Sequence, residues 1–298
     1  MIAAGVTPIA IIQGTENRWF YKYSEVRRAL ELKETIETFF ETYNIPENLS
    51  SIEEEDWAML MVYENAMRAI VEAAKVLEGE LYPTASSVIP FLDTIIEDLK
   101  KLSNKVKLGV ERNYVNTLLT NLQSNQRFPD GYKCETPYNI LTLLDPRHSD
   151  LYFNEEQYNK SVYDLYIDSV YDDMKINGAV LSNKAPSPDP PVCVLANPQD
   201  SLAQRRAALL AKKKGNGPVT QGQGPITLKD KLQEELSKYL ELRGCIDLDK
   251  NPMDWWRINH KSFQLLSMFW KAHSAFPATS TSAERAFSMD GLIFQPTR

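Results

Sequence analysis

The stretch that decides the fold is residues 251–298, "NPMDWWRINHKSFQLLSMFWKAHSAFPATSTSAERAFSMDGLIFQPTR". Large aromatic rings bury much apolar area, so such a concentration marks either a hydrophobic core or an interface between molecules. The helical spacing of the rings favours a core, and a seam between two copies is the alternative. The rings in question are those of Trp255, Trp256, Phe263, Phe269, Trp270, Phe276 and Phe287.

One acidic side chain, Glu284, stands in the middle of the segment "PATSTSAERAFSMDG" at 277–291. It is either a catalytic carboxylate or a charge on a helix surface beside Arg285. Metal-dependent chemistry on phosphates needs several carboxylates that converge on the ions. The rest of the chain therefore decides between the two interpretations.

Outward from this stretch the pattern is helical, and strand signals are weak. Ser24 is the expected N-cap of the first helix, and Ser51 with Glu54 forms the expected capping box of the second. A short helix in 137–150 should end at the Asp145-Pro146 turn. The expected helices are 23–43, 51–80, 83–102, 106–128, 137–150, 154–176, 227–242, 258–273 and one that begins near 281.

Residues 182–228 are rich in proline and glycine and are interpreted as a linker between a helical domain, 1–181, and a C-terminal region, 229–298. Within this linker, 200–214 fits a short amphipathic helix. Its basic clusters, Arg205-Arg206 and Lys212–Lys214, favour a solvated charge run. A nuclear localisation or phosphate-contact patch is the alternative.

The bulk composition excludes several classes of protein. With 40 acidic and 33 basic side chains the net charge is −7, which does not suggest uniform binding of nucleic acid or of acidic membranes. The three cysteines show no zinc-site spacing, so reduced structural thiols are expected. No run reaches the ~18 apolar residues that span a bilayer, and the apolar residues 1–14 lack the basic start of a signal peptide.

The C-terminal stretch resembles the C-terminal region of hAT-superfamily transposases. That pattern has a WW pair, here Trp255-Trp256, followed by an [ST]-x-S-x-ER-x-FS core with Ser280, Ser282, Glu284-Arg285 and Phe287-Ser288, and a later arginine, Arg298. "NRWFYKYSEVRRAL" is similar to the family's TRW segment, and "PTASSVIPFL" and "LLDPR" resemble its insertion domain. The resemblance thus runs from about Arg18 to Arg298. A chance match in an unrelated helical scaffold conflicts with the dense spacing of the ER-x-FS core.

The resemblance implies a mainly α chain, namely the helical insertion domain of an interrupted RNase H-like transposase fold with the C-terminal helical remnant of that fold. In the family, three acidic residues bind two metal ions and cut DNA, and Glu284 falls at the glutamate position. Arg18, Trp19 and Arg285 are the residues that would contact DNA, Trp19 by stacking on a base. A buried anchor at the start of a helix is the alternative for Trp19, and an ordinary surface arginine is the alternative for Arg285. The residues expected in the dimerisation surface or core are Trp255, Trp256, Phe263, Leu266, Phe269 and Phe287.

The two aspartates of the family's catalytic site precede the insertion domain, and no aspartate precedes Arg18. We therefore expect no complete Mg²⁺ or Mn²⁺ site and no enzymatic activity in a transposase-derived, nuclear protein. Its expected partners are a second copy of itself and DNA, without a small-molecule substrate, cofactor or membrane. The alternative is a fragment of an active hAT DNA transposase whose N-terminus, with a BED-type zinc finger, is missing. Because Pro296 opposes the helix that continues the family pattern, the C-terminal region is also expected to be truncated.

Overall fold

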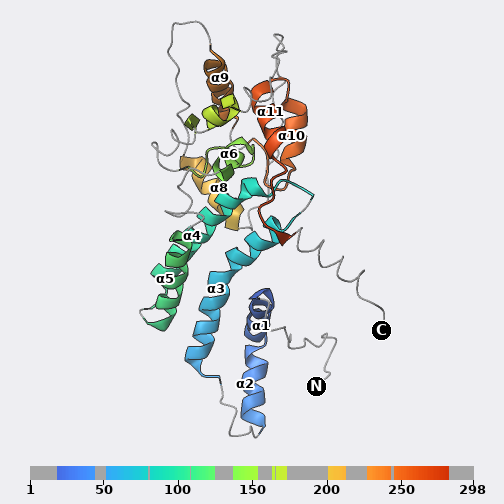
Figure 1. Ribbon diagram of the computed structural model, residues 1–298. Helices are drawn as coiled ribbons and strands as arrows, with labels where there is room; N and C mark the ends of the chain where they lie inside the picture. The colour runs from blue at the N-terminus through green and yellow to red at the C-terminus, as the bar shows by residue number, and fades with distance from the viewer. Residues whose placement is uncertain are drawn as a thin grey trace, which may run out of the picture. The chain divides into compact units, whose positions relative to one another are not determined.

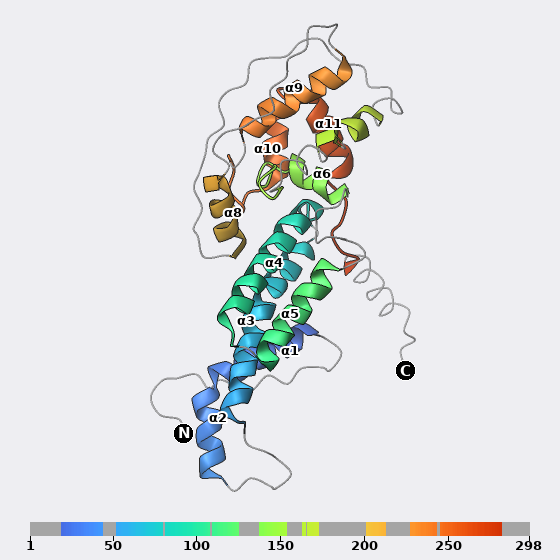
Figure 2. The ribbon, with the colours of Figure 1, turned by 90° about the vertical axis from the view of Figure 1, so that its left-hand side faces the viewer.

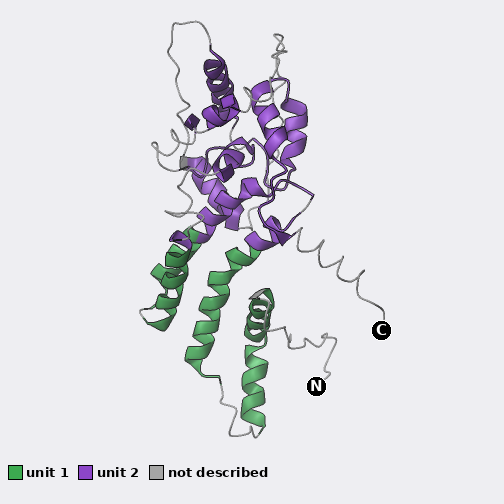
Figure 3. Cartoon of the chain, viewed as in Figure 1, with its two compact units in different colours: residues 1–72, 96–121 green, residues 73–95, 122–298 purple. Residues whose placement is uncertain are grey.

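The computed structural model describes residues 19–43, 52–79, 81–107, 109–124, 137–153, 163–164, 166–172, 201–212, 227–242 and 245–281. Within these ranges the regular elements are all helices, so the predicted helical class is confirmed (Figure 1). Contacts divide the chain into two compact units (Figure 3). Unit 1 comprises residues 1–72 and 96–121, and unit 2 comprises 73–95 and 122–298.

The described residues of unit 1 form helices that bury few large side chains. Trp57, only 1% exposed, is its largest buried ring. Tyr23 donates a hydrogen bond to Glu64 across 3.1 Å, and the rings of Tyr63 and Tyr114 lie 6.2 Å apart. The helices that contribute to this unit are α1 (Trp19–Glu31), α2 (Lys33–Thr42), α3 (Glu54–Leu77), α4 (Val88–Lys105) and α5 (Val110–Gln123).

Two predictions about helix starts in this unit are wrong. The first helix begins at Trp19, and the Ser24 hydroxyl inside it donates to the Phe20 carbonyl instead of capping the helix. A kink at Leu32, with φ −103° and ψ 10°, separates α1 from α2 where one helix was expected. Glu54 is the first residue of α3, so it cannot stand at the third helical position, where a capping box needs its acidic residue. Asp56 stands at that position instead and accepts from the Glu53 backbone N–H.

Unit 2 holds the larger core, and it includes residues 73–95, which carry the C-terminal end of α3 and the start of α4 (Figure 3). The short 3₁₀ helix η1 leads into α4, and the predicted short helix ended by Asp145 is confirmed as α6. Residues 163–164 and 166–172 are also helical. The remaining elements are η1 (Ala85–Ser87), α6 (Pro137–Leu144), α8 (Ser201–Lys212), α9 (Leu228–Glu241), α10 (Pro252–Asn259) and α11 (Gln264–His273).

The C-terminal helices differ from the predicted 258–273 helix because the chain breaks between α10 and α11. Asn251 caps α10 by accepting from the Met253 backbone N–H across 3.0 Å, and Pro252 follows as its first residue. After the turn at 260–262, Phe263 adopts φ −129° and ψ 66° and its ring is buried. The helix expected from 281 lies outside the described residues.

Candidate functional site

The aromatic rings of the C-terminal stretch pack on one another inside unit 2. Tyr239 of α9 stacks on Trp256 with 5.6 Å between ring centroids, and Trp255 stacks on Phe263 at 5.8 Å. Trp255 and Trp256 themselves meet edge to face at 5.0 Å. These rings are all buried, as are Leu266 and Phe269. The cluster is therefore the core that joins α9, α10 and α11.

A polar contact fixes Trp256 within this core. Its indole N–H donates across 3.1 Å to the carbonyl of Leu144, which lies at the end of α6. The last carbonyls of a helix have no partner within the helix. The tryptophan thus satisfies one of them and links two segments that are 112 residues apart in the sequence.

Glu235 of α9 caps the N-terminus of α11, a contact that sequence reasoning missed. Its carboxylate accepts from the backbone N–H of Leu265 at 3.0 Å and of Leu266 at 3.4 Å. Burial raises the pKa of Glu235 to about 7, although these backbone donors and Lys238 act in the opposite direction. Because its partner helix lies 30 residues further along the chain, periodicity within α9 gives no signal for this role.

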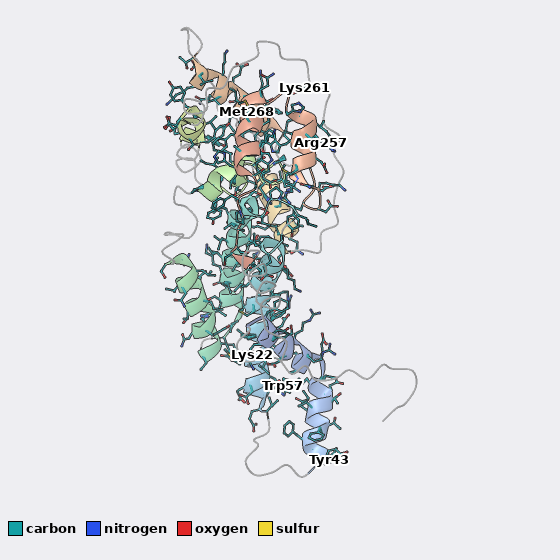
Figure 4. All side chains as sticks on the ribbon, turned by 45° about the vertical axis from the view of Figure 1, so that its right-hand side comes forward. Lys22, Tyr43, Trp57, Arg257, Lys261 and Met268 are labelled. Atoms are coloured by element: carbon teal, nitrogen blue, oxygen red, sulfur yellow. The ribbon has the colours of Figure 1, made fainter. Side chains whose placement is uncertain are left out.

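Several apolar side chains on α10 and α11 remain exposed to solvent. Ile258 is 74% exposed, Met268 47% and Met253 41%. Two basic residues are exposed as well, Arg257 of α10 and Lys261 of the turn that follows it (Figure 4). The outer surface of the C-terminal helices thus combines apolar groups with charged ones, among them the ion pair of Arg257 and Asp254.

Residues 235–298 match the family model described as the hAT family C-terminal dimerisation region. This match supports an hAT-family, transposase-derived protein. The family predicted from 251–298 is confirmed, and the match begins within α9, so it contains Glu235 and most of the aromatic core. No curated protein matches this chain.

The structure does not describe most residues that the hAT resemblance assigned to DNA and metal. Arg18, Glu284, Arg285 and Phe287 lie outside the described residues, and Trp19 is described only as the first backbone position of α1. Among the described residues, no three His, Cys, Asp or Glu side chains gather as a metal ion requires. In the same ranges, no helix is both long enough and apolar enough to cross a membrane.

The LLDPR segment that resembles the hAT insertion domain forms a buried polar cluster. Asp145 is fully buried and accepts from Ser86 across 2.6 Å and from the guanidinium of Arg147 across 2.7 Å. Burial alone would raise the pKa of Asp145, but the charge of Arg147 and the hydrogen bonds from Arg147 and Ser86 lower it to about 2. Burial lowers the pKa of His148 to about 3, so this ring is neutral at physiological pH. The cluster holds η1 against α6 and is closed to solvent.

The basic pair of α8 is internal, so the prediction of a solvated charge run is wrong for Arg205 and Arg206. Arg205 binds Asp93 of α4 with its Nε 2.6 Å from Oδ2, and Arg206 donates to the Ile246 carbonyl. The sequence pattern missed this because the partner, Asp93, lies 112 residues away.

Proposed function

We propose that this transposase-derived chain functions by self-association through its C-terminal region. The observation that carries the proposal is the match of 235–298 to a dimerisation region whose helices, α10 and α11, expose Ile258, Met268 and Met253. The rings of Trp255, Trp256, Phe263, Phe269 and Trp270 are buried in the core of the same chain, so the contact between copies would use the exposed side chains instead. Exposed apolar groups that are surrounded by polar ones are typical of protein interfaces.

Sedimentation of the full chain over a concentration series tests the proposal. We expect a reversible dimer, and a sample that stays monomeric at every concentration would overturn the proposal. Ile258→Asp should weaken the dimer, because a charge replaces the most exposed apolar side chain of α10. Met61→Asp is the matched control, since Met61 is a 54% exposed residue of α3 outside the matched region.

We further propose that the chain is the helical insertion of an interrupted RNase H-like fold with its C-terminal remnant, and that it does not cut DNA by itself. In support, its first aspartate is Asp56, at the exposed start of α3, where acids favour the helix dipole. Incubation with DNA ends and Mg²⁺ or Mn²⁺ should yield no cleavage. Cleavage that disappears in Glu284→Ala would contradict this.

The alternative, a piece of an active hAT DNA transposase, is favoured by the retained ER-x-FS core around Glu284. The missing aspartates would then be encoded upstream in the same reading frame. If an in-frame extension that supplies them restores metal-dependent cleavage, the alternative holds for the longer protein.

DNA binding and nuclear localisation complete the proposal, with Arg18, Trp19 and Arg285 as the contacting residues. Because the chain carries a net charge of −7, we expect weak binding that falls steeply with salt. Fluorescence anisotropy with labelled duplex DNA at two salt concentrations measures it. Equal binding by wild type and by a variant with all three residues changed to alanine would remove them from the contact.

A further inference from the structure

A groove of about 480 Å³ opens in unit 2 between the loop that follows α3 and the segment that follows α11. The two segments lie side by side in both ribbon views (Figures 1 and 2). Leu81 on the loop is 94% exposed, and Phe276 on the opposite wall is 52% exposed. The apolar side chains that line the groove are Leu81, Tyr82, Pro83, Met253, Phe276 and Pro277.

Specific contacts hold the loop wall in place. Tyr82 donates from its hydroxyl to the Val76 carbonyl across 2.8 Å, close to the end of α3. Its ring lies where a side chain on Gly79 would be, because a Cβ there would come within 2.3 Å of the ring. The backbone N–H of Ala278 donates to the Thr84 hydroxyl across 3.1 Å and ties the two walls together. The groove is therefore formed before any partner binds, which lowers the entropy lost on binding.

We propose that a second copy of this chain occupies the groove, with Leu81 of each copy inserted into the groove of the other. This inference rests on the proposed self-association and extends it to residues outside 235–298. One wall of the groove, Met253 with 274–277, belongs to the matched dimerisation region, so the groove is continuous with the surface the proposed function uses. The other wall, Gly79 with 81–84, lies outside the matched region.

The shape and charge of the site also fit a second copy. A two-fold interface requires one patch that complements itself, and a projecting leucine beside an apolar hollow meets that requirement. Among the described residues that line the groove there is no Asp, Glu, Lys or Arg, so none of them offers a charge to a phosphate backbone or a charged peptide. An uncharged contact also limits repulsion between two copies that each carry a net charge of −7.

The test uses the full chain and two single variants, Leu81→Asp and Met253→Lys. Each should raise the dissociation constant of the dimer at least about tenfold, because each places a charge in an apolar contact that occurs twice in the dimer. An equimolar mixture of the two variants should recover association. In the mixed dimer, the aspartate of one copy meets the lysine of the other, and the second contact remains native. Val110→Asp, at a 74% exposed position of α5, is the control.

The sedimentation results separate the proposed self-association from the proposed role of the groove. A monomeric wild type overturns the proposed function and this inference together. A dimeric wild type with both variants unchanged overturns the inference alone and leaves self-association standing. If each variant weakens the dimer but the mixture does not recover, the pairing of Leu81 with the groove is wrong. Circular dichroism verifies that both variants fold, as expected because Leu81 and Met253 are 94% and 41% exposed.

Discussion

Arg205 of α8 and Asp93 of α4 form an ion pair across 112 residues of sequence, with Nε and Oδ2 2.6 Å apart. The Asp93 side chain is 1% exposed and that of Arg205 is 14% exposed. A buried carboxylate that loses its cation is costly, whereas an exposed pair contributes little. The contact therefore holds α8 against α4 within unit 2, although the composition of the segment around α8 resembles that of a linker.

Arg205→Gln should destabilise the protein by about 3 kcal/mol, because it removes the guanidinium charge beside Asp93. Chemical denaturation followed by tryptophan fluorescence measures the change. Arg257→Gln is the control, since Arg257 forms an ion pair with Asp254 in which both side chains are largely exposed. Its cost should stay below about 0.5 kcal/mol. Equal losses in the two variants would mean that α8 is not held by this contact.

Acid should weaken the Asp145 cluster. The pKa of Asp145 is lowered from 3.8 to about 2 in the folded chain, so its contribution is complete above pH 4 and is lost as the pH falls through 2. That contribution is about 2 kcal/mol. Asp145→Asn should remove this part of the pH dependence, which denaturation at pH 5 and pH 2.5 would show. Leu143→Ala, a core change without a titrating group, should lose stability equally at both pH values.

The contribution of Glu235 to stability should depend on pH in the opposite direction to that of Asp145, and at pH values closer to neutral. Its pKa is raised from 4.5 to about 7, so the folded chain holds the proton more tightly than the unfolded chain. Stability should therefore fall by about 3 kcal/mol as the pH rises from 4.5 through 7, and stay level at higher pH. Glu235→Gln should flatten this decline while it still accepts from Leu265 and Leu266. The control Leu236→Ala, on the same helix, should keep the decline, and a decline that persists in Glu235→Gln would refute the assignment.

The sequence predicted what depends on local periodicity and missed what depends on distant partners. The short helix before Asp145 and the helix that Thr227 caps follow from apolar spacing and turn residues, and both are present. The break before Phe263 was missed, because the apolar spacing runs through it without interruption. Ser24 was misplaced because a serine inside a helix can bond back to the carbonyl four residues earlier as readily as it can cap.

The same limit applies to the candidate site. The family could be predicted because its motif is a linear pattern of residues 255–298. The Glu235 cap and the Arg205–Asp93 pair could not, since each joins residues that only the tertiary fold brings together. The assigned roles of Glu284 and Arg285 stay predictions, because both residues lie outside the described ranges.

Phe269→Ala should separate the core from the contact between copies. Phe269 is 6% exposed and lies against Tyr166 and His273, with ring centroids 5.9 Å and 4.1 Å away. Removal of a buried phenyl ring costs about 3–5 kcal/mol. We therefore expect a loss of that size in chemical denaturation for Phe269→Ala, and a similar one for Trp255→Ala. Phe39→Ala, at a 54% exposed ring of α2, should cost less than about 1 kcal/mol. A Phe269→Ala protein that keeps its stability but no longer dimerises in sedimentation would place this ring between copies instead of in the core.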